Sequence, residues 1–479
     1  MVFTSPEYII FFVICVGLYF FIPYRLRWIW LLVAGYLFYA YKQSQYLWVL
    51  LTVTLVSYGA GRIFASVEGT RTRKITLGVS LVINFGLLFV FKYFNFFNAT
   101  LESISAQLNI PYQIQALNLI LPLGISFYIF QSSAYVIDVY KGKVGAEKHA
   151  GIFGAFVAFF PLLIAGPIER ANHLLPQFHV RQFFHSERTV EGFRRILWGV
   201  FKKIVIADRL ALYVNAVYNN ATDYTGIPLI LATFFFAFQL YCDFSAYSDI
   251  ALGTAKVMGF DLIENFRQPY FATSIREFWN RWHISLSTWF RDYIYIPLGG
   301  SRVSLPRTLI NVMIIFLVSG LWHGANWTFI VWGALHGLFI CLETLWERLR
   351  PQAKPLFPAG IKIAFTFSLV LITWVFFRAT TFEDAAHIFR YSLTLSGGEQ
   401  LFTPFASAIL PPIWEMIISF VLIGLLILVD LRSAKVGLNT LFSSMPTALR
   451  WGAYYACGFA VMFSGLYANG AQEFIYFNF

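Results

Sequence analysis

Two histidines lie inside an apolar stretch of the chain, where an ionisable side chain is costly. Residues 311–337 read NVMIIFLVSGLWHGANWTFIVWGALHG and contain His323 and His336. A charged side chain at the centre of a membrane helix costs about 2.5–3.5 kcal/mol, so such residues have a buried partner, line a cavity or take part in chemistry. Gly320 and Gly324 flank His323, and glycine permits bent or closely approached backbone. The pattern predicts an interrupted helix with His323 as the reactive centre.

A second histidine lies in residues 276–300, which read REFWNRWHISLSTWFRDYIYIPLGG. The segment carries too many charges for a membrane span, so we expect helices that lie at the cytoplasmic boundary or fold into the protein. Helical spacing places Trp279, Trp282, His283 and Trp289 near one broad face. Periodicity alone favours a structural role for His283, as a core histidine whose ring nitrogens are hydrogen-bonded, and a catalytic role is the alternative.

The chemistry that suits such histidines is general-base catalysis. A neutral imidazole takes the proton of a hydroxyl while its oxygen attacks an activated acyl group, which typically contributes about a hundred- to ten-thousandfold. Positioning of the substrates and hydrogen-bond donors directed at the oxyanion supply the remainder of the rate enhancement. Trp322 adjoins His323, and Asn326 is a candidate oxyanion donor from its spacing alone. The sequence has no glycine-rich phosphate loop, serine nucleophile motif or metal-ligand cluster, so no metal site is predicted.

Two carboxylates also lie in apolar sequence. Residues 241–249 read YCDFSAYSD and contain Asp243 and Asp249. These side chains either orient a histidine or line a polar pathway, or they form a buried clamp with Arg or Tyr. We favour the clamp.

The composition excludes an ordinary soluble domain. Of 479 residues 58% are hydrophobic and 12% charged, and the mean hydropathy is +0.65. We expect an all-α polytopic membrane protein with about ten to twelve spans, re-entrant segments and membrane lipids as neighbours. The whole chain is expected to form one integral membrane domain, with N-terminal spans (1–116), a core (117–346) and C-terminal spans (347–479). The expected spans are 8–23, 28–41, 46–61, 75–93, 118–139, 203–219, 229–256, 309–322, 326–345, 362–378, 413–431 and 450–468.

The charge pattern gives an orientation. The net charge of +11 comes from Lys and Arg gathered in particular loops, as the positive-inside rule produces, and does not indicate nucleic-acid binding. The loops 95–116 and 217–227 contain no Lys or Arg and are placed outside, together with both termini. Residues 150–170 begin and end beside basic sequence and are expected to be re-entrant. The expected span 309–322 rises only about 21 Å, which would leave His323 within the membrane.

A basic segment, residues 170–209, contains Arg194, Arg195, Lys202 and Lys203. Contact with lipid headgroups and a role in topology is the favoured interpretation. The alternative is attraction of an anionic cytosolic donor such as a phosphate-rich coenzyme.

Several motifs together resemble the membrane-bound O-acyltransferase (MBOAT) family, and within it the alginate O-acetyltransferase-like branch. They are YCDFSAYSDIALGTAKVMGF, ENFRQPY, REFWNRWHISLSTWFRDYIYIPLGG and GLWHGANWTFIVWGALHG, with supporting pieces LPLGISFYIFQSSAYVIDVYKG, FFPLLIAGPIER, WVFFRATTFEDA and FIYFNF. They run from about residue 121 to the C-terminus.

The resemblance implies a fold with a thin centre, where a cytoplasmic tunnel and an outer funnel meet at His323. His283 matches the second family histidine, and His336 matches one often seen in the branch. The implied enzyme has no permanently bound cofactor and moves an acetyl group from a cytosolic thioester, acetyl-CoA, to an extracytoplasmic acceptor. The resemblance also implies a bacterial cytoplasmic (inner) membrane, an SGNH-type partner outside it and a polysaccharide as final acceptor.

Two other readings stay open. In the same family, D-alanyl transfer to teichoic acid would use an acylated carrier protein as donor. In another class, a transporter would line a proton route with the histidines, but the internal repeats and paired broken helices common in transporters are absent from the sequence.

Overall fold

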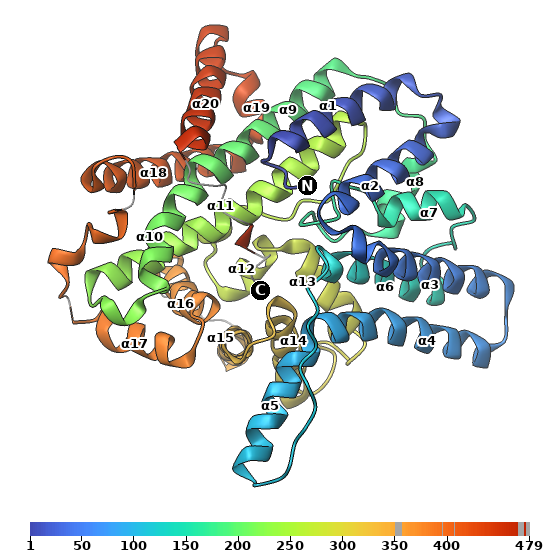
Figure 1. Ribbon diagram of the computed structural model, residues 1–479, viewed down its shortest axis with the longest axis horizontal. Coiled ribbons are helices and arrows are strands. Elements are labelled where there is room, and N and C mark those ends of the chain that lie inside the picture. Colours follow the sequence, from blue (N-terminus) through green and yellow to red (C-terminus); the bar gives the residue numbers. More distant parts are fainter. Residues whose placement is uncertain (350–356, 395, 407, 468–473, 476–479) are drawn as a thin grey trace. The chain divides into compact units, whose positions relative to one another are not determined.

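The fold is described by a computed structural model that covers residues 1–349, 357–394, 396–406, 408–467 and 474–475. Within these residues every regular element is helical, which confirms the expected all-α class (Figure 1). The helices group into two compact units, 1–193 with 251–263 and 194–250 with 264–479. The boundaries therefore fall inside α9 (Ser186–Phe201) and α11 (Ile227–Val257). Both catalytic candidates, His283 and His323, belong to the second unit.

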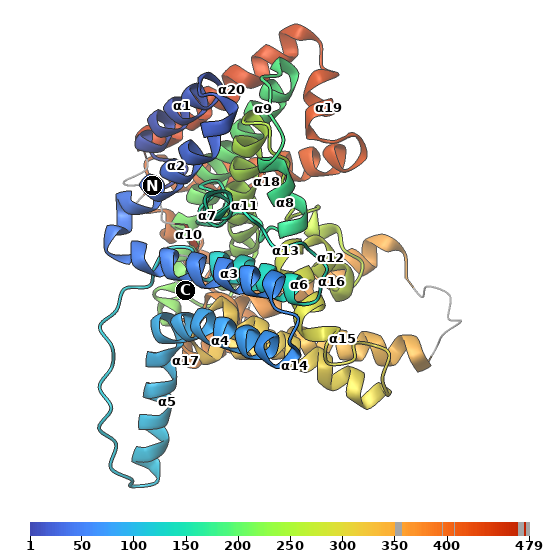
Figure 2. The ribbon, with the colours of Figure 1, turned by 90° about the vertical axis from the view of Figure 1, so that its right-hand side faces the viewer.

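The first unit contains the N-terminal helices, of which α3, α4 and α6 pack against one another (Figure 2). Its helices before α9 are α1 (Pro6–Phe21), α2 (Arg27–Gln43), α3 (Leu47–Ser66), α4 (Thr70–Leu88), α5 (Phe94–Gln107), α6 (Ile125–Tyr140), α7 (Ala150–Val157) and α8 (Ala171–Phe178).

The second unit contains the site helices. After α9 these are α10 (Asp208–Tyr218), α11, α12 (Ile275–Arg281), α13 (Ile284–Phe290), α14 (Leu305–His323), α15 (Trp327–Leu349), α16 (Ala359–Arg378), α17 (Phe382–Ser392), α18 (Pro412–Val436), α19 (Leu438–Ser443) and α20 (Thr447–Tyr467).

Short helices connect or continue the longer ones. Three are π-helices, η3 (Phe89–Tyr93), η4 (Lys202–Ala207) and η7 (Arg291–Tyr295). The others are single 3₁₀ turns, η1 (Tyr24–Leu26), η2 (Ser44–Tyr46), η5 (Ala221–Asp223), η6 (Pro269–Phe271), η8 (Gly398–Gln400) and η9 (Thr403–Phe405).

Seven helical stretches of the described chain are long and apolar enough to cross a membrane, and α1 is a shorter apolar helix. The protein is thus a multi-pass membrane protein, while the span count of ten to twelve stays a prediction. Two expected boundaries are wrong. The expected span 118–139 is helical only from Ile125, and the expected loop 95–116 is helical up to Gln107. The C-terminal tail, placed outside from its charge, lies mostly beyond the described residues.

The segment 150–170 has the backbone expected of a re-entrant piece. α7 is only eight residues long, and the chain continues without regular helix to Arg170. Phe159, Phe160, Ala165 and Ile168 are buried in this stretch. Irregular backbone is tolerated at membrane depth when protein covers it.

The helix that carries His323 is longer than expected. α14 begins at Leu305 rather than residue 309, and its 19 residues rise about 28 Å. The short-span argument for the depth of His323 is therefore wrong. Its burial comes from packing: only 1% of its surface is exposed.

Close backbone contact joins α14 to α15. A Cβ on Gly320 would lie 2.3 Å from the Phe329 carbonyl oxygen, and one on Gly333 would lie 2.2 Å from that of Phe316. Small residues allow membrane helices to approach in this way. The helix interruption predicted at Gly324 is confirmed, because α14 ends at His323 and α15 begins at Trp327.

Residues 276–300 fold into the protein as the short helices α12 and α13 and the π-helix η7. α12 ends at Arg281 and α13 begins at Ile284, so the expected continuous helical face is wrong. Trp282 and His283 lie in the break and are completely buried. This break brings His283 toward α14.

Candidate active site

His323 is enclosed by aromatic rings. Its ring centroid lies 4.9 Å from that of Trp322, 4.8 Å from Trp332 on α15 and 5.5 Å from Phe377 on α16, all in edge-on arrangements. Such a shell restricts the imidazole to few orientations.

His283 lies beside His323. The two ring centroids are 6.3 Å apart, and Trp322 packs edge-on against both imidazoles, 5.7 Å from that of His283. The backbone of His283 is left-handed, with φ 43° and ψ 52°. This conformation is uncommon for a residue other than glycine, and such strain often occurs at functional sites. The structure thus brings together three residues that the sequence singled out.

Asn265 fixes the proton of His283. Its Oδ1 accepts hydrogen bonds from the backbone N–H and hydroxyl of Ser285, at 3.2 and 2.9 Å. His283 Nδ1 lies 3.2 Å from the same oxygen. Because a carboxamide oxygen can only accept, Nδ1 carries the proton and Nε2 carries the lone pair. Burial lowers the pKa of His283 to about 3, so the imidazole is neutral at physiological pH.

His336 has partners for both ring nitrogens. The Trp279 indole N–H donates to Nδ1 at 3.3 Å, and Nε2 lies 3.0 Å from Thr373 Oγ1. The Thr373 hydroxyl donates to the Val370 carbonyl oxygen at 2.7 Å, so the Nε2–H of His336 donates to Thr373. The structure therefore places His336 in a bridge between α12 and α16, without a free nitrogen for proton transfer.

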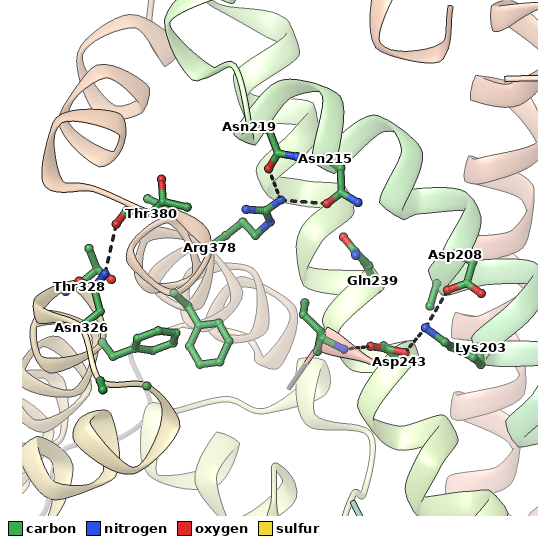
Figure 3. A pocket seen from close by; sticks show the side chains of 17 residues that line it. Lys203, Asp208, Asn215, Asn219, Gln239, Asp243, Asn326, Thr328, Arg378 and Thr380 are labelled. Atoms are coloured by element: carbon green, nitrogen blue, oxygen red, sulfur yellow. Dashed lines mark hydrogen bonds and ion pairs between the residues drawn. The ribbon is translucent and has the colours of Figure 1, made fainter. Parts of the chain in front are cut away.

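A cavity of about 610 Å³ begins at Gly324, directly after His323 (Figure 3). We call it the asparagine cavity, after Asn215, Asn219 and Asn326 in its wall. Phe377, which contacts His323, and Arg378 also line it.

Two sequence candidates lie in the wall of the asparagine cavity. Asn326 Oδ1 accepts from the Thr328 N–H at 3.0 Å and its Nδ2 donates to the Thr380 carbonyl at 3.2 Å, so the carboxamide caps α15 and joins it to the end of α16. Asp243 forms an ion pair with Lys203 at 2.8 Å and accepts from the Ile475 N–H at 2.8 Å. The favoured clamp thus has lysine as its cation at Asp243, whereas at Asp249 it includes the expected arginine, Arg195.

A second cavity, of about 480 Å³, lies on the other side of His323 along α14. Its wall includes Ile284, which follows His283, and Ser319, one turn before His323. Arg276 and Arg291 also line it, and we call it the arginine cavity. Arg291 is half exposed and pairs through Nε with its neighbour Asp292 at 2.9 Å.

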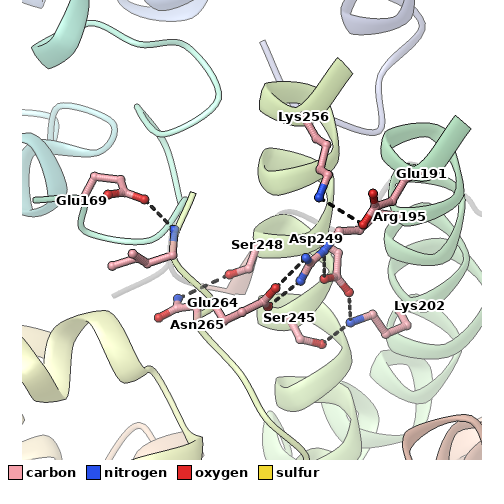
Figure 4. A network of polar contacts seen from close by, with 11 residues as sticks. Glu169, Glu191, Arg195, Lys202, Ser245, Ser248, Asp249, Lys256, Glu264 and Asn265 are labelled. Atoms are coloured by element: carbon pink, nitrogen blue, oxygen red, sulfur yellow. Dashed lines mark hydrogen bonds and ion pairs between the residues drawn. The ribbon is translucent and has the colours of Figure 1, made fainter. Parts of the chain in front are cut away.

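The basic residues proposed for donor attraction are engaged inside the second unit. Lys202 pairs with Asp249 at 2.7 Å, and Arg195 contacts Asp249 at 2.9 Å and Glu264 at 2.6 Å (Figure 4).

The other two have partners as well. Arg194 donates to the Tyr454 hydroxyl at 2.7 Å, and Lys203 lies between Asp208 and Asp243, 2.8 Å from each. Lys202 and Lys203 are consecutive residues of the π-helix η4, and both meet carboxylates of α11.

Sequence reasoning missed four residues near the site. Asn265 lies in the ENFRQPY motif and Arg378 in WVFFRATTFEDA, but neither was given a role. Trp332 shares a helix face with His336 at i,i+4 spacing, which was a usable signal. Arg291 was considered only as one of the charges that place residues 276–300 at the cytoplasmic boundary of the membrane. In the described part of the chain, no group of three His, Cys, Asp or Glu side chains is placed to hold a metal ion.

The fold and the site define a polytopic membrane protein with two adjacent buried histidines, and a cavity adjoins the chain on each side of His323. Comparison with known proteins gives the family. Residues 152–382 match the model of the MBOAT, membrane-bound O-acyltransferase family.

Relatives cover most of the chain. A probable alginate O-acetylase of Azotobacter vinelandii is 42% identical over 389 residues, 80% of this chain and 76% of the relative. A probable alginate O-acetylase of Pseudomonas putida is 42% identical over 395 residues, 81% of this chain and 79% of the relative. The peptidoglycan O-acetyltransferase of Helicobacter pylori is 33% identical over 395 residues, which are 77% of this chain and 74% of the relative. The chain belongs to the membrane-bound O-acyltransferase family and is an O-acyltransferase.

The buried neutral state of His283 predicts a pH dependence of stability. Its pKa of about 3 lies below the value of about 6.5 for an exposed histidine. Between these values the unfolded chain binds a proton that the folded chain does not, so acidification lowers the free energy of unfolding. In His283→Gln we expect the unfolding temperature to fall less steeply than in wild type from about pH 6.5 to 4. Thermal unfolding in nanodiscs measures this, with exposed His185→Gln as control. Equal slopes for wild type and His283→Gln would contradict it.

Proposed function

We propose that this enzyme transfers an acetyl group from acetyl-CoA in the cytosol to the hydroxyl of an acceptor outside the bacterial inner membrane, with a polysaccharide as the final acceptor. His323 is the general base and His283 orients the reacting groups. The names of the relatives, which are O-acetylases and an O-acetyltransferase, support acetyl as the acyl group.

The observation that carries the proposal is the position of His323 between two cavities. The arginine cavity follows the last turns of α14 before His323, and the asparagine cavity begins at the next residue, Gly324. Residues 276–300 were placed at the cytoplasmic side and 217–227 outside, so the first cavity is the donor side and the second the acceptor side. A donor and an acceptor on opposite sides can thus meet at one imidazole.

The reaction then needs one proton acceptor and no covalent enzyme intermediate. The imidazole of His323 takes the acceptor hydroxyl proton as the oxygen attacks the thioester carbonyl carbon. The tetrahedral oxyanion collapses, the carbon–sulfur bond breaks, and the thiolate receives the proton from the imidazolium. The products are the acetyl ester and the free thiol of the coenzyme. His283, held by Asn265 with its lone pair on Nε2, orients the donor or a water beside His323.

Trp332 is our candidate for oxyanion stabilisation. Its ring is completely buried against His323, and its indole N–H has no hydrogen-bond acceptor within the described residues. A buried unsatisfied donor costs about 1–3 kcal/mol, so a role with substrate accounts for its presence. Donors held ready for developing charge are a main source of catalysis.

Arg291 takes over the donor role first considered for the basic segment. It lines the arginine cavity and uses only Nε in its ion pair within the described chain, whereas Arg276, in the same wall, is paired with Glu347. Guanidinium groups match the phosphates of a coenzyme. We propose that Arg194, Arg195, Lys202 and Lys203 instead hold the helices of the second unit together.

The remaining parts of the proposal concern location and partners. The positive-inside pattern places the N-terminus outside, and the C-terminal tail on the same side, although its last residues lie outside the described part. An SGNH-type protein on that side would complete transfer to the polysaccharide.

His323 is tested by donor turnover. We expect His323→Ala to lower release of free coenzyme from radiolabelled acetyl-CoA by at least about a hundredfold, because the general base is lost. Purified protein in nanodiscs is assayed, with His185→Ala as a surface control that keeps wild-type turnover. Undiminished turnover by His323→Ala would rule out the assignment, and turnover only with a D-alanyl carrier protein would favour the alternative donor.

Arg291 is tested by donor binding. We expect Arg291→Gln to weaken acetyl-CoA binding about tenfold and to reduce its salt dependence, since a charge-assisted phosphate contact is lost. Calorimetry on nanodiscs measures the affinity. Arg307→Gln, which removes an exposed arginine outside the cavity, is the matched control. If Arg194→Glu/Arg195→Glu weakened binding in a stable protein and Arg291→Gln did not, the donor site would belong to the basic segment.

The role of Trp332 is tested by measuring donor affinity and turnover separately. We expect Trp332→Phe to lower turnover about a hundredfold while donor affinity changes little, because the indole N–H acts on the oxyanion. Trp414→Phe, at an exposed position of α18, serves as control. A parallel loss of donor affinity would instead assign Trp332 to ground-state packing.

A further inference from the structure

No step of the proposed reaction uses a small basic pocket in the first unit. The pocket has a volume of about 220 Å³ and is lined by residues of α2, α7 and α8 and of the segments beside them. α2 packs against α7, and α7 packs against α8 (Figure 1). Every lining residue belongs to the first unit. We call it the α2 pocket, because Arg27 and Trp28, at the start of that helix, lie in its wall.

The α2 pocket carries positive charge without a compensating carboxylate. Arg27 is 9% exposed, and its guanidinium donates to three backbone carbonyl oxygens, at 2.6, 3.0 and 3.2 Å. Arg25, in the same wall, is exposed and has no hydrogen bond or ion pair to described residues. No Asp or Glu is among the described residues that line the pocket. Because a buried cation without a counter-ion is costly, the pocket favours an anion.

His149 adds a hydrogen-bond donor to this wall. Its Nδ1 accepts from the Ile152 N–H at 3.2 Å, so the neutral imidazole carries its proton on Nε2. The Trp28 ring packs edge-on against the imidazole, with the centroids 4.6 Å apart, and restricts its orientation. The neighbouring Glu147 pairs with His179 at 2.8 Å and does not line the pocket. The pocket thus offers one N–H donor and two guanidinium groups to a ligand.

The chain around the pocket has the character of a membrane surface. The positive-inside pattern places the connection between α1 and α2 in the cytoplasm, together with the loop before α7. Phe21 is 88% exposed and Leu26 is 49% exposed, and both lie close to Arg25 in the chain. Trp28 and Tyr24 are residues of the types that gather at the level of lipid headgroups. Cations next to exposed apolar side chains suit a ligand that has both a phosphate and acyl chains.

We propose that the α2 pocket binds the phosphate of an anionic phospholipid of the cytoplasmic leaflet. Arg25, Arg27 and His149 contact the phosphate, and the acyl chains lie along Phe21 and Leu26. Basic pockets between membrane helices on the cytoplasmic side are suited to anionic headgroups. The bound lipid ties the start of α2 to the start of α7. This inference does not depend on the proposed acyl transfer.

An anionic lipid fits the α2 pocket better than other phosphate compounds. Phosphatidylethanolamine brings an ammonium group, for which the described lining has no carboxylate and two cations that repel it. A nucleotide coenzyme needs more room, since pockets for molecules of that size have volumes of about 300–1,000 Å³. Inorganic phosphate matches the charge but has no apolar part for the exposed side chains. It is the competing source of a phosphate, and the experiment includes it.

The test counts single binding events by native mass spectrometry on full-length protein in detergent. Phosphatidylglycerol and phosphatidylethanolamine with identical acyl chains are titrated separately, and inorganic phosphate is titrated in a third series. We expect wild type to bind the first phosphatidylglycerol at least about tenfold more tightly than phosphatidylethanolamine, because charge-assisted contacts act on an anion without an opposing ammonium. Arg25→Gln should remove most of this preference, and Arg25→Lys should retain most of it.

The matched control is Arg71→Gln, which removes an exposed arginine of α4 in the same unit but outside the pocket. It should keep the wild-type preference. Arg25 is exposed, so its variants are expected to fold, and thermal unfolding checks this. Equal affinity of wild type for the two lipids, or a preference that survives in folded Arg25→Gln, would overturn the proposal. Arg25-dependent binding of inorganic phosphate without a preference for phosphatidylglycerol would also overturn it, in favour of a soluble anion.

Discussion

The close approach of α14 and α15 is the constraint on which the site depends. Gly320 and Gly333 let one backbone lie against the other, and any side chain there would overlap a carbonyl oxygen. The tight turn between the helices leaves His323 at the end of α14 and returns Trp332 to its side. A wider helix pair would open the aromatic shell to lipid or water, and the imidazole would lose its fixed orientation.

Ion pairs join α9 and η4 to α11 in the same unit as this hairpin. The paired cations of η4 and α9 meet carboxylates of α11, so each buried ion has a compensating neighbour. Removing one partner from such a pair typically costs about 3–5 kcal/mol, because the other charge stays buried. The polar residues of this region therefore hold helices in register. They leave Arg378 as a cation whose described partners are neutral.

The two cavities differ in chemistry, and this difference suits two different substrates. One carries arginines beside apolar α14 residues, and the other carries carboxamides and hydroxyls around a single positioned guanidinium. The linings of the two cavities include residues next to the imidazoles, Gly324 after His323 and Ile284 after His283. Acyl transfer across a membrane needs this arrangement, because neither substrate has to cross.

The sequence by itself determined the helical class, the membrane location and the interrupted helix at Gly324, because hydropathy and glycine act locally. The catalytic roles of His323 and His283 stay predictions. Tertiary structure decided the partners. The satisfied ring of His336, the Asn265 contact that sets the His283 tautomer and the carboxylates around Lys203 join residues far apart in the chain. A local sequence pattern does not show which of these distant residues contact each other, because the packing of the helices decides it. The same packing decides which polar side chains are left to contact substrate.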